Sequence, residues 1–449
     1  MEKVGALVGW AEDNAVKCGL ALFLFHLTLS ATLFAIACSP YLAGMHNGHG
    51  LWNFSMDSIG FDQWATHGAR LLQEGGFSSW WHGDGTILDD GNHHLISELV
   101  EHYPHVRLIS LCYFLFTPHP IAFAPVNAFV WTATVFAVYA LARTLMPNNR
   151  NMAALGTMLF TLMPTYLLQT TQLLKDPLYI LGASLFLLGG ARLLNGRQVW
   201  SSVVIIVVGM QLCVLLRDYM LPAFALLVVV IIVMAFVRIP TPRIFAALTA
   251  GVLLMLVSWQ LLETGGDIHF PGVSVSQPLP DVSQSLDRII QSVQGTREAF
   301  YGFNAGSVVD KDVVFKGWVD GLHYVPRALQ VGLLSPFPSC WFQPDQSTLA
   351  GSRLLAGSEM MVLYVLMIGF VGFIFLRAIP LRLRLFLLVF TFLFIILLGM
   401  AVPNMGAIYR MRYAYLLPIV LCGVYGWLAV LKRSGLSPTE TERLGRDGI

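Results

Sequence analysis

Residues 199–238 read VWSSVVIIVVGMQLCVLLRDYMLPAFALLVVVIIVMAFVR, two apolar runs of similar length that are separated only by Arg217-Asp218-Tyr219. A helix that crosses the hydrocarbon core of a bilayer, roughly 30 Å thick, needs about 20 mostly apolar residues. Each run has about that length. The stretch therefore predicts two consecutive membrane-spanning helices joined by a short polar turn.

The whole chain has the same character. It has 449 residues, of which 56% are hydrophobic and only 12% are charged, against roughly 25% charged residues in an average soluble domain. This composition excludes an ordinary soluble enzyme. Its 27 basic and 26 acidic residues nearly cancel, so the chain has no net basic field with which to hold nucleic acid. We expect an all-α polytopic membrane protein with about ten transmembrane helices, near residues 18–42, 119–145, 152–171, 176–195, 199–216, 219–238, 243–262, 355–377, 383–402 and 409–432.

The charges of the connections predict the orientation of these helices. The short connections after the second, fourth, sixth and eighth spans carry arginines but no acidic residue, which makes them cytoplasmic by the positive-inside rule. Residues 44–104 contain one arginine, Arg70, against eight acidic residues, so this loop is extracytoplasmic, together with 263–350. The apolar segment 105–117 is too short to span and is interpreted as an interfacial helix. Both termini are then cytoplasmic.

Four regions follow from this layout. Residues 1–262 form a transmembrane module that includes the first extracytoplasmic loop, 44–118. Residues 263–350 form a large late extracytoplasmic loop, whose proline and aromatic residues favour an ordered lid on the membrane surface. Residues 355–432 form the C-terminal transmembrane helices, and 433–449 form a polar, disordered cytoplasmic tail.

Polar clusters beside a membrane are candidates for function, because polar residues are costly there unless they are solvated or partnered. The first cluster runs from Asp57 through Asp62 to His67 and continues as a helix-like segment to Gly75. If that helix begins at Ser58, Asp57 is its N-cap. Alternatively, Asp57 is a carboxylate that accepts a proton from an attacking hydroxyl group.

The next two clusters lie in short extracytoplasmic turns. Lys175-Asp176-Pro177 is typical of a helix N-cap followed by its first turn, and it is also a candidate site. Arg217 is either an interfacial anchor whose long side chain reaches the lipid surface or a ligand for an anion. The sequence alone leaves both pairs of interpretations open.

The last cluster is the segment Tyr409-Arg410-Met411-Arg412. On one helix Arg410 and Arg412 point in different directions, so at most one of them needs to face a cavity and the other can face lipid head groups. Guanidinium groups bind phosphate oxygens in pairs, which makes a phosphate site the functional interpretation. In the late loop, Arg297 and Arg327 are further cations that could reach a phosphate, and His323 lies beside them.

A metal site has weaker support. The stretch 82–102 is rich in histidine and acidic residues, which could bind a divalent cation, but the spacing is irregular and matches no metal motif. We therefore assign no metal ligand. The chain also lacks GxxxxGK[ST], HExxH and GxSxG motifs, which excludes nucleotide-driven pumping and the commonest hydrolases.

The layout resembles the GT-C class of membrane glycosyltransferases, which use a sugar carried on a polyprenyl phosphate or diphosphate. The resemblance rests on Asp57, Tyr103-Pro104, Lys175-Asp176-Pro177, Pro336-Phe337-Pro338 and the Tyr409 to Arg412 segment. It implies that Asp57 is the catalytic carboxylate, with Asp62 as its rival and Asp176 as a second acidic group. The second loop has no Asp-x-Asp, so a metal site like that of the oligosaccharyltransferase branch is not expected.

By the same resemblance, the lipid phosphate would be held by Arg410 or Arg412, together with Arg217. Lys175 and Arg327 are further cations that we expect at the phosphate, and neighbouring polar residues are expected to contact the substrate. The expected phosphate ligands are Arg410, Arg412, Arg217, Lys175 and Arg327. The expected substrate contacts are His67, Tyr409 and His323.

The expected activity is inverting transfer of a sugar from the carrier to a hydroxyl group of a lipid, glycan or protein acceptor, at the outer face of a bacterial inner membrane. One alternative is a glycan polymerase or ligase that joins lipid-diphosphate oligosaccharides. Another is a secondary transporter, which predicts paired broken helices near the bilayer midplane.

Overall fold

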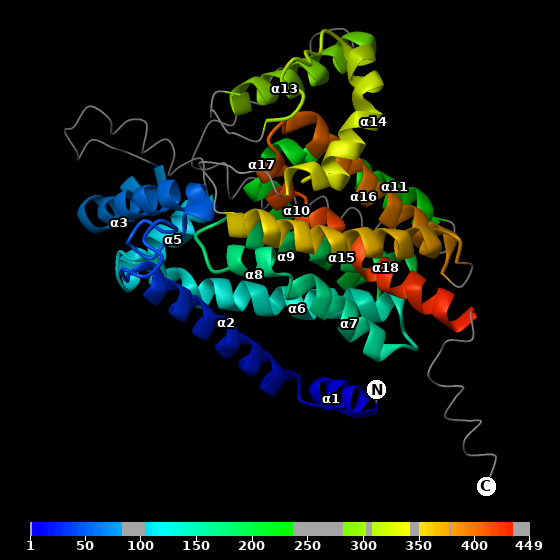
Figure 1. The fold of residues 1–449 in the computed structure, drawn as a ribbon, viewed down its shortest axis with the longest axis horizontal. Coiled ribbons are helices and arrows are strands. Elements are labelled where there is room, and N and C mark those ends of the chain that lie inside the picture. Colours follow the sequence, from blue (N-terminus) through cyan, green and yellow to red (C-terminus); the bar gives the residue numbers. More distant parts are fainter. Residues whose placement is uncertain are drawn as a thin grey trace.

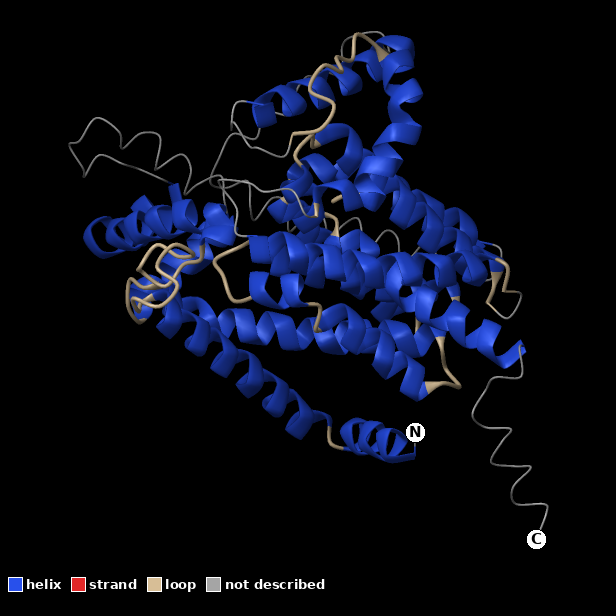
Figure 2. Cartoon of the chain, in the orientation of Figure 1, coloured by secondary structure: helices blue, strands red, loops and turns tan. Residues whose placement is uncertain are grey.

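The computed structural model describes residues 2–82, 104–196, 198–236, 282–301, 308–341, 350–376 and 379–433. Within these residues every regular element is a helix, and no strand is present (Figure 2). Eight of the helices in the described part of the chain are long and apolar enough to cross a membrane. The expectation of an all-α polytopic membrane protein is confirmed at this level.

The spanning helices are α2 (Ala15–Ala37), α6 (Ala124–Leu145), α9 (Asp176–Leu194), α10 (Val199–Leu216), α11 (Leu221–Phe236), α15 (Ala350–Ile374), α16 (Leu381–Ala401) and α18 (Tyr413–Arg433). The other helices are α1 (Glu2–Asp13), α3 (Met56–His82), α5 (Pro104–Leu115), α7 (Arg150–Thr161), α8 (Pro164–Gln169), α13 (Val282–Tyr301), α14 (Trp318–Leu334) and α17 (Met405–Met411), with short 3-10 turns η1 (Asn53–Ser55), η2 (Pro120–Phe123), η3 (Asp218–Met220) and η4 (Pro338–Cys340).

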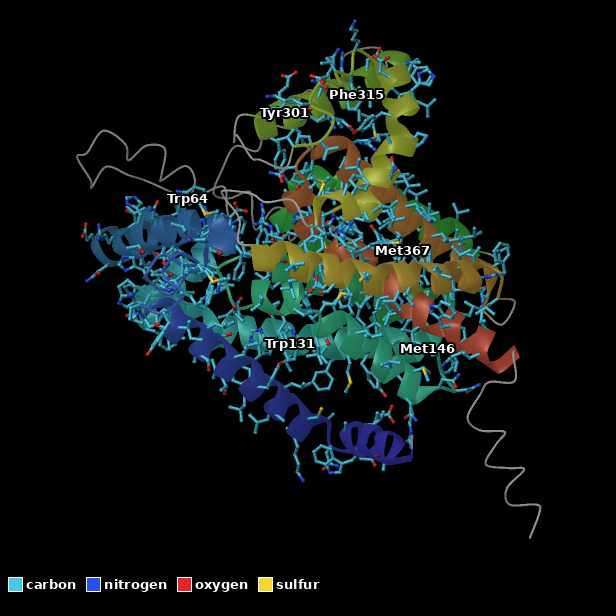
Figure 3. The ribbon with its side chains drawn as sticks, viewed as in Figure 1. Trp64, Trp131, Met146, Tyr301, Phe315 and Met367 are labelled. Carbon is cyan, nitrogen blue, oxygen red and sulfur yellow. The ribbon has the colours of Figure 1, made fainter. Side chains whose placement is uncertain are left out.

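One predicted span, 152–171, is wrong as a single helix. The chain forms α7 and then α8, with a break before Pro164, because proline has no N–H group to continue a helix. The carbonyl of Thr161, at the end of α7, accepts a hydrogen bond of 3.1 Å from the indole of Trp131, which lies on α6 (Figure 3). Another predicted span, 243–262, lies outside the described residues, as do the predicted tail from residue 434 and most of the histidine-rich stretch, 83–103.

Glycine allows the central helices to pack closely. A Cβ atom at Gly182 of α9 would lie 2.8 Å from the carbonyl oxygen of Gly209 on α10. A Cβ atom at Gly426 of α18 would overlap the carbonyl oxygen of Gly369 on α15. Such small-residue contacts bring helix backbones together within a membrane, where the hydrophobic effect does not drive one helix onto another.

The segments predicted to lie outside the membrane gather away from the chain ends. Figure 1 shows α3 and α5 on the left, α13 and α14 at the top, α1 at the bottom and the end of α18 on the right. The segment 105–117 forms the separate short helix α5, as expected. The predicted helix from Ser58 to Gly75 is the first part of α3, which bends at Gly76, whose φ of +75° suits glycine.

The late loop contributes two helices that form a lobe at the outside of the bundle. Tyr301 and Phe315 lie in this lobe (Figure 3). The α14 helix packs against α16, with Gly332 facing the carbonyl of Ile395. A short antiparallel bridge joins Val308 to Asn404, and the N–H of Val309 donates to the carbonyl of Pro403 at 2.7 Å. The lobe is therefore attached to the chain just before α17.

Candidate functional site

Arg410 on α17 joins two carboxylates that come from distant parts of the sequence. Its Nη2 atom forms a hydrogen bond and ion pair with Asp57 of α3, 353 residues earlier in the chain. Its Nε atom lies 3.2 Å from a carboxylate oxygen of Asp176. The first-loop acid, the second-loop acid and the late arginine that the sequence singled out thus form one cluster.

The α17 helix is a seven-residue helix with a well-formed N-terminus. Asn404 is its N-cap, and its side-chain oxygen accepts the backbone N–H groups of Gly406 at 2.9 Å and Ala407 at 3.3 Å. Asparagine is among the strongest N-cap residues because its side chain satisfies amides that have no partner in the helix. This cap determines where the helix begins and therefore where Arg410 lies.

Arg217 completes the cluster from the end of α10. Its Nη2 atom donates to Asp176 at 2.5 Å, and both side chains are almost fully buried, with 1% and 5% exposed. The guanidinium group also lies over the ring of Tyr179, 4.3 Å from its centroid, and the Tyr179 hydroxyl is 2.6 Å from that of Tyr415 on α18. Arg217 is therefore held between α9 and α10, and it is not a lipid-facing anchor.

Lys175 adds a third cation immediately before Asp176. Burial and the positive charge of Arg217 lower the pKa of Lys175 to about 8, since both disfavour a further charge. Near neutral pH the side-chain amino group of Lys175 is therefore protonated in most molecules. The cluster then holds three cations against two carboxylates, a surplus that suits an anionic ligand such as a phosphate.

The members of the cluster differ in their exposure to solvent. The side chain of Asp57 is 49% exposed and that of Arg410 is 22% exposed, whereas Asp176 and Arg217 are buried. In addition, the Nε and Nη1 atoms of Arg217 have no hydrogen-bond partner among the described residues. A ligand that approaches past Asp57 would therefore meet Arg410 first, with unsatisfied donors of Arg217 behind it.

The structure corrects both N-cap interpretations. The α3 helix begins at Met56, so Asp57 lies within its first turn. The α9 helix begins at Asp176 itself, whose carboxylate binds two arginines and caps no backbone amide. In both places a long-range ion pair takes the carboxylate that local geometry would have used for a cap.

Asp62, the rival base, is directed elsewhere. Its carboxylate accepts a hydrogen bond of 2.5 Å from the hydroxyl of Tyr113 on α5, and burial raises the pKa of Asp62 above its usual range. Because Asp62 follows Asp57 by five residues, the two point to different sides of α3. His67 is buried on the same helix, and the ion pairs of the cluster do not include it.

Arg412 is also placed away from the cluster, and the expectation that it could face lipid head groups is wrong. It is fully buried. Its Nη1 atom donates to the carbonyls of Gly332 at 3.1 Å and Leu333 at 2.9 Å, and its Nη2 atom contacts the sulfur of Met360. These carbonyls belong to the last turn of α14, which has no further helix to satisfy them. Arg412 therefore fastens the lobe to the bundle.

The remaining predicted residues lie in the lobe or beneath the cluster. Arg327 binds Asp310 through two hydrogen bonds of 2.8 and 2.9 Å, and this pairing lowers the pKa of Asp310. His323 is exposed on α14. Tyr409 is buried, and its hydroxyl donates to Glu359 of α15. None of these three forms an ion pair or hydrogen bond with Asp57, Asp176 or Arg410 that is resolved among the described residues.

Several residues of the site were not singled out from the sequence. They are Tyr179, Tyr415 and His105 of α5. His105 is buried, and it lies close enough to Lys175 and Asp176 for their charges to act on it. Burial, followed by the charge of Lys175, lowers the pKa of His105 to about 3. His105 is therefore neutral at physiological pH. Glu359, which binds Tyr409, was also not singled out. The sequence could have indicated it, because an acidic residue inside an apolar span is rare.

Within the part of the chain that the structure describes, no group of three or more histidine, cysteine or acidic residues could hold a metal ion. Comparison with known proteins adds no family: no family model, curated protein or solved structure matches this chain. The function must therefore be argued from the cluster itself.

Proposed function

We propose that this protein is an integral membrane glycosyltransferase that transfers a sugar from a polyprenyl phosphate carrier to an acceptor hydroxyl group. The observation that carries the proposal is the pairing of Arg410 with both Asp57 and Asp176 at one end of a helical bundle. Such a transfer needs a carboxylate to accept the proton of the acceptor hydroxyl and cations to neutralise the leaving phosphate, and the cluster contains both. A donor anchored in the bilayer accounts for a site at the end of spanning helices.

The reaction is a displacement at the anomeric carbon. The acceptor oxygen forms a bond to that carbon while the bond from the carbon to the phosphate oxygen breaks, and the electron pair leaves with the phosphate. Asp57 takes the proton of the acceptor hydroxyl, as a general base. Arg410, Arg217 and Lys175 neutralise the charge that develops on the leaving phosphate. Attack from the side opposite the phosphate inverts the configuration of the sugar.

The contact between Arg410 and Asp57 links binding of the donor phosphate to release of the catalytic base. The phosphodiester of the donor carries one negative charge, which grows to two as its bond to the sugar breaks, and it competes with Asp57 for the same guanidinium group. When the donor binds, Arg410 turns to the phosphate and Asp57 loses its partner. The base is therefore released when the leaving group is in place, while Asp176 keeps Arg410 and Arg217 in position.

A secondary transporter is the second candidate, and two observations favour it. The span of α7 and α8 is interrupted at Pro164, and the buried carboxylate of Glu359 lies against the interruption. Interrupted helices and intramembrane acids are common in transporters. The ion cluster, however, joins helix ends and surface segments, as a site for a lipid head group requires.

The test uses the purified full chain in lipid nanodiscs with a panel of polyprenyl phosphate hexoses and pentoses, and cell-envelope lipids and glycans as acceptors. We expect sugar transfer with the wild type and a loss of at least ~100-fold for Asp57→Asn, the effect of removing a general base. Asp218→Asn is the matched control, because Asp218 is an exposed acid beside Arg217 that forms no ion pair among the described residues. Full activity of Asp57→Asn would refute the assignment. Substrate uptake into vesicles without transfer would favour the transporter.

A further inference from the structure

Tyr409 precedes Arg410 on α17 and anchors that helix to the bundle. Its hydroxyl donates to Oε2 of Glu359 on α15 and lies 3.2 Å from the hydroxyl of Thr165 at the start of α8. Because burial and the charge of Glu359 raise the pKa of Tyr409, this hydroxyl remains protonated and available as a donor. The backbone of α17 next to Arg410 is thereby tied to two other helices.

Glu359 is the acceptor that both neighbours share. It lies in the membrane-spanning part of α15 and is 4% exposed, a position where a carboxylate is costly unless it is well satisfied. Its Oε1 atom accepts the backbone N–H of Thr165 at 2.5 Å, while Oε2 accepts Tyr409. Two neutral donors thus fill its two oxygens, and no ion pair to it is present among the described residues.

The interruption between α7 and α8 makes the Thr165 amide available. In a continuous helix this N–H would donate to the carbonyl of Thr161, four residues earlier. Here that carbonyl accepts the indole of Trp131 instead, and Glu359 takes its place as the acceptor for Thr165. A short turn then leads from the end of α8 at Gln169 to Lys175 and Asp176.

We infer that Glu359 is a positioning residue of the ion cluster, because one carboxylate holds both the segment that carries Arg410 and the segment that leads to Asp176. Through Tyr409 and Thr165 it sets the separation of the two groups that meet at 3.2 Å. This geometric role does not depend on any ligand. Its consequence for a phosphate group rests on the proposed function.

The first experiment measures the position of Arg410 without any substrate. Phenylglyoxal labels accessible arginines, and peptide mass spectrometry gives the labelling rate at each site in the full chain. We expect Glu359→Gln and Tyr409→Phe to raise the rate at Arg410 by about 10-fold, the effect of losing one hydrogen bond to a charged group. Arg217, which is 2% exposed, stays unlabelled in both.

Tyr364→Phe is the matched control. Tyr364 also lies on α15 and donates its hydroxyl to a carbonyl, that of Leu334 at 3.0 Å, but this bond leads to α14 and not to α17. Its removal costs a comparable hydrogen bond and leaves the labelling of Arg410 unchanged. Equal labelling of Arg410 in wild type, Tyr409→Phe and Glu359→Gln, with all three folded, overturns the inference.

The second experiment measures binding of farnesyl phosphate to the same variants in nanodiscs, with inorganic phosphate in a parallel arm. We expect affinity for farnesyl phosphate to fall by about 10-fold in each variant, and the double variant to be no weaker, because both changes remove one support. Tighter binding of farnesyl phosphate than of inorganic phosphate identifies a lipid-borne ligand.

The two experiments separate the two ideas. Faster labelling of Arg410 together with no binding of either phosphate by the wild type leaves the positioning role standing and defeats the proposed function. Binding by the wild type that Tyr409→Phe and Glu359→Gln both retain in full overturns the positioning role alone.

Discussion

Replacing Arg410 or Arg217 by glutamine separates their contributions to binding and to stability. The pair of Arg410 and Asp57 is partly exposed, at 22% and 49%, and solvent-screened pairs of this kind contribute about 1 kcal/mol or less. Asp176 keeps Arg217 at 2.5 Å when Arg410 is removed. Arg410→Gln should therefore lower the free energy of unfolding by only about 1–2 kcal/mol.

Arg217→Gln has a different expected cost. Both members of its pair with Asp176 are buried, and removal of Arg217 leaves the carboxylate of Asp176 with the weaker 3.2 Å contact to Arg410 and the nearby charge of Lys175. Breaking a buried pair typically costs about 3–5 kcal/mol. Adding Asp176→Asn to this variant should recover part of that loss, because the remaining charge is removed.

Both arginine variants remove a charged donor from the proposed phosphate site, so each should weaken binding of farnesyl phosphate by about 10- to 100-fold. Unfolding titrations in mixed micelles and binding measurements in nanodiscs give the two quantities. Arg410→Gln should show a large loss of affinity with a small loss of stability. If it unfolds as easily as Arg217→Gln, or binds farnesyl phosphate as the wild type does, the assignment of Arg410 to the ligand is refuted.

Three further predictions test the surroundings of the site. Because the pKa of Lys175 is about 8, its positive charge is lost as pH rises through that value, and farnesyl phosphate should bind more weakly at pH 9 than at pH 7. Lys175→Arg should make the affinity less dependent on pH. Identical pH profiles for the wild type and Lys175→Arg would contradict the role of Lys175. Gly426→Ala should lower the free energy of unfolding by about 1–3 kcal/mol, because its Cβ atom would overlap the backbone of α15. Gly372→Ala should change this free energy little, because its Cβ atom would meet nothing closer than 3.8 Å. Equal unfolding titrations of the two variants would count against the packing argument. Asp310→Asn should loosen the lobe by about 1–2 kcal/mol, seen as faster hydrogen exchange in α14, and unchanged exchange would show that its pair with Arg327 carries no stability.

Much of the architecture could be predicted because the membrane imposes a length. An apolar run of about 20 residues is read directly from the sequence, and the eight spanning helices were found in this way. The break in 152–171 was also written in the sequence, since Pro164 lies inside the run. Hydropathy averages over such a residue, so it detects that a segment crosses but not that the crossing is made of two helices.

The site could be predicted only in part. Charge asymmetry placed Asp57, Asp176 and Arg410 on one side of the membrane, and their contact confirms that these three meet. Helical periodicity indicated that Arg410 and Arg412 diverge, but which one joins the acids depends on the position of α14, whose last carbonyls take Arg412. No local pattern carries that information, because it belongs to helices that lie far apart in the sequence.

Because Asp57 and Arg410 lie far apart along the chain, their contact can form only late in synthesis of the protein. At about 5–20 residues per second, a ribosome needs roughly 20–70 s to make the 353 residues between them. Asp57 is therefore made long before its partner on α17 exists, and Asp176 of α9 is made part-way through that interval. A nascent chain that ends before α17 therefore lacks the contacts of Arg410 with Asp57 and Asp176, and the ion cluster can form only after α17 has been made.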